Sequence, residues 1–168
     1  VRLALGVLCV VHDVLDSQDL CHVCEVSQLP PTFFALAGPL IAFEPDTANT
    51  GTPPMRSASG SKLRIRHDAV REMLLARLGG GEIRRLHRRL LARLAPWPPP
   101  QDLDAASEQG EPLSARTAYA LRHRLRHCVE ASDWGAVEQL TSDVRYLTAK
   151  VRHVGTLALE HDFALAAG

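Results

Sequence analysis

Residues 62–74 read KLRIRHDAVREML, and this stretch decides the fold. Charged and apolar residues alternate over 62–66, which is the pattern of a half-buried β-strand. Asp68 follows, and its carboxylate can accept hydrogen bonds from the free amides of a first helical turn. From Val70 onward, apolar residues recur at helical spacing over 69–78. The stretch therefore predicts a strand that turns directly into an amphipathic helix.

Three short helices are predicted ahead of this strand, separated by capping and helix-breaking residues. Their expected ranges are 1–15, 18–28 and 33–40. We expect Asp16 to cap the second helix, Pro30 to end it and Thr32 to cap the third. An apolar run at 40–43 predicts a second strand, joined to 62–66 by the Pro-, Ser- and Gly-rich loop 44–61. Three helices followed by strand, loop and strand indicate a winged helix.

Helical patterns continue on both sides of a proline-rich, acidic segment. The glycine run 79–81 is expected to end one helix, and the next covers 82–94. Further short helices with tight connections follow, one of them capped by Asp133. We therefore predict a mainly α fold, a winged helix followed by antiparallel helical hairpins. Its parts are a winged-helix domain at 1–95, a linker at 96–114 and a helical arm at 115–168.

Composition limits the classes of function that the chain can have. The chain has 168 residues, with 19 basic and 19 acidic side chains, so its net charge is zero. This balance argues against binding nucleic acid or anionic lipid through bulk charge. The apolar run 3–11 is shorter than the roughly 20 residues of a membrane-spanning helix. We therefore expect a cytoplasmic chain without a membrane partner. The first residue is Val, and we expect the chain to be a piece of a longer protein.

Three of the four cysteines cluster near the start of the chain, together with histidines. The pairs Cys9-x-x-His12 and Cys21-x-x-Cys24 supply the number of ligands that a zinc site needs. Only eight residues separate the two pairs, which is short for a zinc knuckle. The neighbours of Cys9 are all apolar, as is typical of a buried cysteine in a helix core. We expect no bound metal, and the zinc site stays open as an alternative.

Catalytic motifs are missing from the sequence. It contains no phosphate-binding G-x-x-x-x-G-K-[ST] loop, no G-x-S-x-G elbow and no H-E-x-x-H zinc motif. His123 and His127 lie four residues apart and could share a metal on one helix face. Arg122 and Arg126 flank them, so we expect a solvated face instead. The segment is not expected to be an enzyme by itself.

The Arg66-His67-Asp68 motif between a strand and a helix resembles a known family. The chain is similar to the winged-helix part of the STAND signal-transduction NTPases, which include NB-ARC and NACHT regulators and relatives bearing WD40 repeats. In that family a strand, a Met-His-Asp-type motif and an amphipathic helix close the winged helix. Here Arg66 stands in place of Met. The segments YALRH, ASDW and YLTAK, within 119–150, resemble the helical arm that follows.

The resemblance implies a regulatory role. In the family, the motif histidine contacts the β-phosphate of bound ADP and holds the molecule closed. By resemblance that role falls on His67, with Asp68 capping the helix at this nucleotide sensor. The resemblance also implies an upstream nucleotide-binding domain, a downstream repeat domain and oligomerisation on activation. ADP or ATP would bind to the full-length protein, and no cofactor to this segment alone. The segment would then hold the closed state and relay ligand binding at the sensor domain.

A winged-helix transcriptional regulator that binds DNA is the alternative. Its recognition helix would be 33–40, and its wing would be the loop 44–61. The helix reads FFALAGPL and has no Arg, Lys, Asn or Gln to contact base edges. Residues 1–55 carry one basic and six acidic side chains, which repel phosphate. Residues 56–95 carry eleven basic and three acidic side chains, so a phosphate-binding patch there stays open. Nucleic acid is the less favoured partner.

Overall fold

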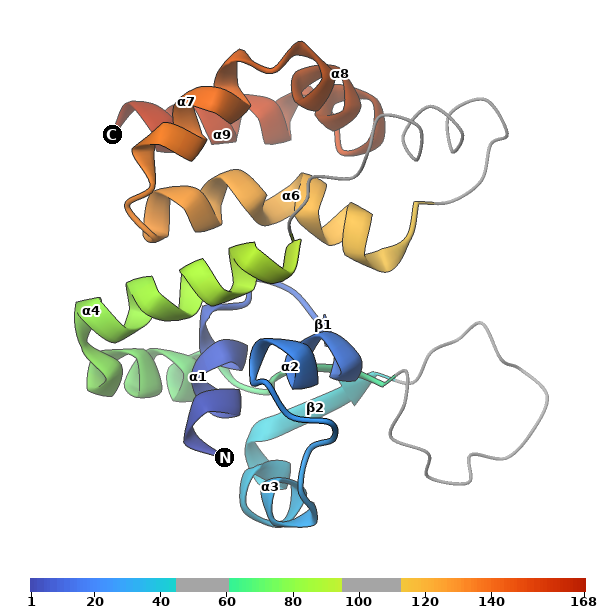
Figure 1. The fold of residues 1–168 in the computed structure, drawn as a ribbon, viewed down its shortest axis with the longest axis vertical. Coiled ribbons are helices and arrows are strands. Elements are labelled where there is room, and N and C mark those ends of the chain that lie inside the picture. Colours follow the sequence, from blue (N-terminus) through green and yellow to red (C-terminus); the bar gives the residue numbers. More distant parts are fainter. Residues whose placement is uncertain (45–60, 95–112) are drawn as a thin grey trace, which may run out of the picture. The chain divides into compact units, whose positions relative to one another are not determined.

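The computed structural model describes residues 1–44, 61–94 and 113–168 (Figure 1). Helices and one small three-stranded antiparallel sheet make up these residues, which confirms the mainly α fold with a small β-wing. The chain divides into two compact units, Val1–Leu86 and His87–Gly168. We expected the division at 96–114, whereas the border lies inside helix α4 (Asp68–Leu94). Most of the predicted linker, and most of the predicted wing loop 44–61, lies outside the described residues.

Unit 1 has the element order of a winged helix, α1–β1–α2–α3–β2–β3–α4 (Figure 1). Strand β3 lies between β1 and β2 and pairs antiparallel with both. A short 3₁₀ turn, η1 (Gly38–Leu40), connects α3 to β2. The elements before α4 are α1 (Arg2–Val10), β1 (Leu15–Asp16), α2 (Ser17–Val23), α3 (Pro31–Ala37), β2 (Ile41–Glu44) and β3 (Lys62–Ile65).

The beginning of the chain differs from its prediction at several helix boundaries, and the second helix ends at Val23 instead of residue 28. The first helix ends at Val10 instead of residue 15, because the chain turns there to add β1 to the sheet. Thr32 does not cap α3: the helix begins at Pro31, whose missing amide hydrogen is tolerated in a first turn. The predicted cap at Asp16 is confirmed, since its carboxylate accepts a hydrogen bond of 2.7 Å from the amide of Gln18.

The core of unit 1 follows the alternation in β3. Leu63 and Ile65 are 1% and 8% exposed, whereas Arg64 between them is exposed. Leu63 pairs with Leu15 of β1, and Ile65 pairs with Ile41 of β2. The sheet therefore presents one apolar face to the helices, as a half-buried antiparallel sheet must. The helices contribute buried apolar residues that include Val7, Leu8, Leu20, Val23, Phe33 and Ala37.

Helix α4 contains a sharp kink at the glycine run. Gly79 has φ 74° and ψ 154°, which is not helical, and helical geometry resumes after it. Ahead of the kink, the Arg71 guanidinium donates a 2.7 Å hydrogen bond to the carbonyl of Cys9 in α1. Leu86, after the kink, is buried in unit 1. The predicted break between two helices thus lies at the expected residue, with no loop between them.

Unit 2 consists of the end of α4 and four further helices (Figure 1). Very short connections join those four helices to one another. Helix α6 packs against each of the three helices that follow it. An apolar stripe of α6 is buried, with Leu121, Leu125 and Cys128 each at most 1% exposed. The predicted cap at Asp133 is also confirmed, because its carboxylate accepts from the amide of Ala136 at 3.2 Å. The helices are α6 (Ala115–Glu130), α7 (Trp134–Ser142), α8 (Val144–His153) and α9 (Thr156–Ala167).

The kink yields a first testable prediction. Gly79→Ala forces a side chain into a left-handed backbone, which costs roughly 1–2 kcal/mol, so we expect the free energy of unfolding to fall by about that amount in urea titrations. Gly81→Ala is the matched control, because Gly81 has open space around its Cβ position and no positive φ. There alanine should be neutral or stabilising by up to about 1 kcal/mol. Equal effects at both positions would contradict the assigned kink.

Candidate functional site

The predicted sensor residue His67 lies at the corner between β3 and α4. Strand β3 ends at Ile65 and α4 begins at Asp68, and the His67 side chain between them is exposed. The carbonyl of His67 accepts 3.1 Å hydrogen bonds from the amides of Val70 and Arg71. The backbone of His67 is therefore fixed by the first turn of α4, while its imidazole is free to face a partner.

Asp68 lies one position further along than predicted. It is the first residue of α4 rather than the residue before the helix, and the carbonyl of His67 accepts the first helical hydrogen bonds instead. The negative charge of Asp68 still lies in the first turn, where it complements the partial positive charge of the helix end. Asp68 is thus an acidic residue at the helix start, as predicted. It is favourable there because of its charge, since it does not occupy the capping position.

Basic side chains lie along β3 and directly after it, next to this corner. Arg64 is exposed and pairs with Glu44 of the neighbouring strand at 3.1 Å. Arg66 donates a 3.3 Å hydrogen bond to the carbonyl of Ile41. The corner thus offers an exposed imidazole, nearby guanidinium groups and the amides of a helix start. Groups of this kind can bind an anion.

The cysteine and histidine pairs near the chain start do not converge. Cys9 is fully buried in α1, and burial raises the pKa of its thiol to about 11. At neutral pH the thiol is protonated, whereas a zinc ligand must be a thiolate. The His12 ring lies 3.5 Å from the Arg71 guanidinium, and Cys21 and Cys24 are free thiols. Within the described ranges, no group of three or more His, Cys, Asp or Glu side chains could hold a metal ion.

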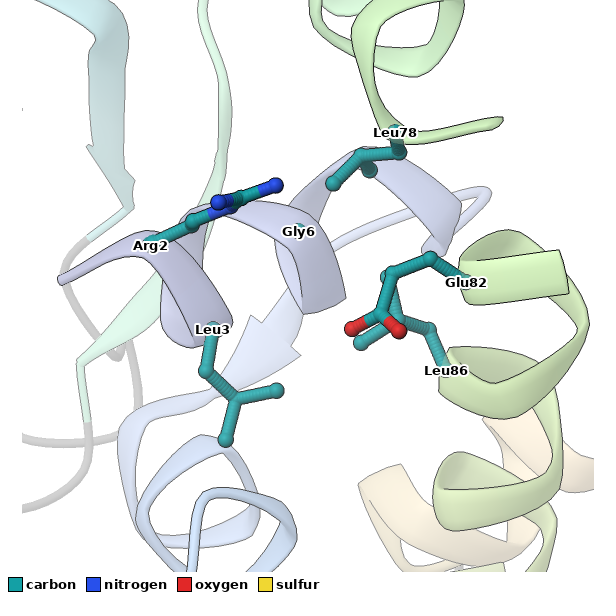
Figure 2. Close-up of a pocket in the computed structure, with 6 residues that line it drawn as sticks. All are labelled: Arg2, Leu3, Gly6, Leu78, Glu82 and Leu86. Carbon is teal, nitrogen blue, oxygen red and sulfur yellow. The ribbon is translucent and has the colours of Figure 1, made fainter. Parts of the chain in front are cut away.

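A hollow of about 430 Å³ opens between α1 and the kink of α4 in unit 1 (Figure 2). Its lining is mainly aliphatic, and a Cβ on Gly6 would come within 3.1 Å of Leu86. The Glu82 carboxylate faces the hollow in Figure 2 and lies 3.8 Å from Arg85 on its own helix. The six lining residues supply no nucleophile paired with a base. They are Arg2, Leu3, Gly6, Leu78, Glu82 and Leu86.

The prediction of a solvated face for His127 is wrong. His127 is 0% exposed, and its Nδ1 atom lies 2.8 Å from the Nδ1 atom of His87 at the end of α4. The reason is that α6 is buried on a second face, formed by Ala120, His127 and Ala131, beside the leucine stripe. Two small residues at helical spacing around a histidine are the signal that sequence analysis missed.

A fully buried ion pair joins α8 and α9. The Lys150 ammonium group lies 2.5 Å from the Asp162 carboxylate and donates a 3.1 Å hydrogen bond to the carbonyl of Arg122 in α6. The Tyr146 hydroxyl donates to the same carboxylate at 2.7 Å. Burial lowers the pKa of Lys150, and the hydrogen bond to Asp162 opposes that shift. Burial and the neighbouring carboxylate both raise the pKa of Tyr146, so its hydroxyl keeps its proton.

The ion pair gives a second prediction. Lys150→Met leaves the buried Asp162 carboxylate without its cation, which typically costs about 3–5 kcal/mol. We expect a loss of that size in urea unfolding, and we expect Lys150→Met/Asp162→Leu to recover most of it. Arg126→Met is the matched control, because it breaks an exposed pair with Glu130 at 3.8 Å and should cost at most about 1 kcal/mol. A double variant as unstable as the single one would refute the explanation.

Comparison with protein-family models, curated proteins and solved structures finds no match to this chain. Among the described helices, none is both long and apolar enough to cross a membrane. An inference about function therefore rests on the geometry of the described residues.

Proposed function

We propose that this chain is the winged-helix and helical-arm segment of a STAND-type signalling NTPase. In this role it holds an ADP-bound closed state and relays ligand binding from a sensor domain. The observation that carries the proposal is the exposed His67 at the point where the last strand of a winged helix turns into α4. No catalysis is proposed for the segment itself, since the nucleotide site would lie on an upstream domain of the same chain.

The corner is suited to a phosphate contact across a domain boundary. An imidazole can donate a hydrogen bond to phosphate as the neutral ring or as the cation, and a bond to a charged group contributes about 1.5–3 kcal/mol. That energy shifts a closed–open equilibrium by about 10- to 150-fold, enough to favour an off state without locking it. The Arg66 guanidinium adds positive charge beside the ring, whereas the Asp68 carboxylate in the first turn of α4 offsets the positive end of the helix.

Unit 2 is compatible with an arm that continues into further structure. Helix α9 has apolar residues on its exposed side as well as its buried side, with Leu157 78% and Phe163 44% exposed. Helices that are apolar all round are normally covered by other elements. Under the proposal, α9 is covered by the downstream repeat domain, so that ligand binding at the sensor is passed to the helical arm.

The exposed face of α3 favours this role over DNA binding. A winged helix that reads DNA places polar side chains of this helix in the major groove. Here the exposed residues of α3 are Pro31, Thr32, Ala35 and Leu36, and Leu36 is 68% exposed. An apolar helix face of this kind fits contact with protein better than contact with base edges.

The proposal is tested in the full-length protein encoded around this segment. We expect His67→Ala to lower the affinity for ADP by about 10- to 150-fold, the equivalent of one charge-assisted hydrogen bond. The measurement is the ADP dissociation constant by calorimetry, together with the ADP that remains bound after purification. His22→Ala is the control, because His22 is also exposed in unit 1 but lies in α2. An unchanged ADP affinity, or flanking sequence without a nucleotide-binding site, would overturn the proposal.

A further inference from the structure

Two buried histidines form a hydrogen bond with each other where the end of α4 meets α6 inside unit 2. The Nδ1 atoms of His87 and His127 lie 2.8 Å apart, and the rings are 2% and 0% exposed. The Tyr119 hydroxyl lies 2.8 Å from the other ring nitrogen of His127, Nε2. Tyr119, His127 and His87 therefore form one chain of hydrogen bonds that spans α6 and α4.

With both rings neutral, this chain is satisfied in either direction. Tyr119 can donate to Nε2 of His127, whose Nδ1–H then donates to Nδ1 of His87. In the reverse direction, Nδ1–H of His87 donates to His127, whose Nε2–H donates to the tyrosine oxygen. Each bond has one donor and one acceptor in both cases, so the neutral pair stabilises the α4–α6 contact.

Added protons change this balance in two steps. One imidazolium can keep both bonds as a donor, but it places a charge where there is no solvent, which is costly. A second proton makes both Nδ1 atoms donors, so that two N–H groups face each other across 2.8 Å. Neither can accept a hydrogen bond, and the two positive charges repel. The doubly protonated pair cannot keep this geometry.

Two guanidinium groups lie along the described contact between α4 and α6. The Arg88 guanidinium on α4 donates to the carbonyl of Ala131 at 3.3 Å, and Arg116 on α6 donates to the carbonyl of Arg93. Both cations lie along the same α4–α6 contact and oppose further positive charge there.

Three other titratable groups of α6 are His123, Glu130 and Cys128. The His123 ring lies with its centroid 4.8 Å from the Tyr119 ring. Glu130, the acidic residue of α6, pairs with Arg126 at 3.8 Å. Burial raises the pKa of the Cys128 thiol to about 11, so it is uncharged over the physiological range.

The helices on the other side of α6 contribute charges that are already engaged. Lys150 of α8 and Asp162 of α9 neutralise each other at 2.5 Å. Asp133 accepts a hydrogen bond from the first turn of α7, and Glu138 of that helix is exposed.

We propose that the His87–His127 pair is an acid-sensitive catch that holds the end of α4 against α6 at neutral pH and releases it as the pH falls below about 6. The direction of the pH dependence of stability follows from proton uptake. The unfolded or released state binds protons on both rings, and the closed state excludes at least one of them. Stability is therefore present above the ordinary histidine range and is lost as the pH falls. The catch is a property of unit 2 and does not depend on the proposed nucleotide sensor.

The decisive experiment compares the 168-residue chain with His87→Gln/His127→Gln, in which amides keep hydrogen-bonding capacity but do not titrate. In urea titrations between pH 7.5 and 5.5, the unfolding equilibrium constant of the wild type should rise about 10- to 100-fold more than that of the variant. This range corresponds to exclusion of one or two protons from rings with an ordinary pKa of about 6.5. His161→Gln, which removes an exposed histidine of α9, should behave as the wild type. Equal pH dependence of the wild type and the double variant would overturn the proposal.

Two measurements on the wild type keep the test decisive if the double variant does not fold. By NMR, the ring signals of His87 and His127 should stay constant from pH 8 to 6.5. By hydrogen exchange at pH 5.5, corrected for intrinsic rates, residues 87–94 should lose protection before α1 does. Normal titration of both buried rings with unchanged protection of 87–94 would refute the catch.

Discussion

The pairing of strand β3 with its two neighbours is the interaction on which unit 1 depends. The strand pairs with β1 on one side and β2 on the other, so one four-residue strand joins two segments that lie earlier in the chain. The pairs Leu15–Leu63 and Ile41–Ile65 fix its register. Because a shift by one residue would move Leu63 and Ile65 to the solvent face, the register is strongly specified. The same register determines where the strand ends, and thus where His67 is presented.

Much of this arrangement could be predicted from the sequence, because its signals are local. The alternation in 62–66, the acidic caps at Asp16 and Asp133, and the leucine stripe of α6 each reflect the geometry of a single element. Strand β1 could not be predicted. Its two residues are too few to show an alternation, and its pairing depends on a strand almost fifty positions later.

The candidate site was predictable only in part, for the same reason. The position of His67 between a strand and a helix follows from adjacent residues, and its side chain is exposed. Its role as a nucleotide sensor stays a prediction. The burial of His127 instead depends on a second helix that covers α6. Without knowledge of that covering helix, the polar residues on this face of α6 are predicted to be exposed to solvent. The border between the units inside α4 was missed likewise, since a single helix gives no sign of which neighbours its two ends contact.

The kink at Gly79 and the histidine pair act on one helix at different points. The left-handed backbone at Gly79 lets α4 change direction without a break in the chain, so its first part packs on α1 through Arg71. Its last part belongs to unit 2, where close approach to α6 is allowed by Ala120 and Ala131 and His87 meets His127. An apolar residue at either histidine position could fill the same space without a pH-dependent bond. The polar pair instead makes the hold of α6 on α4 conditional on protonation, whereas the backbone turn at Gly79 is insensitive to it.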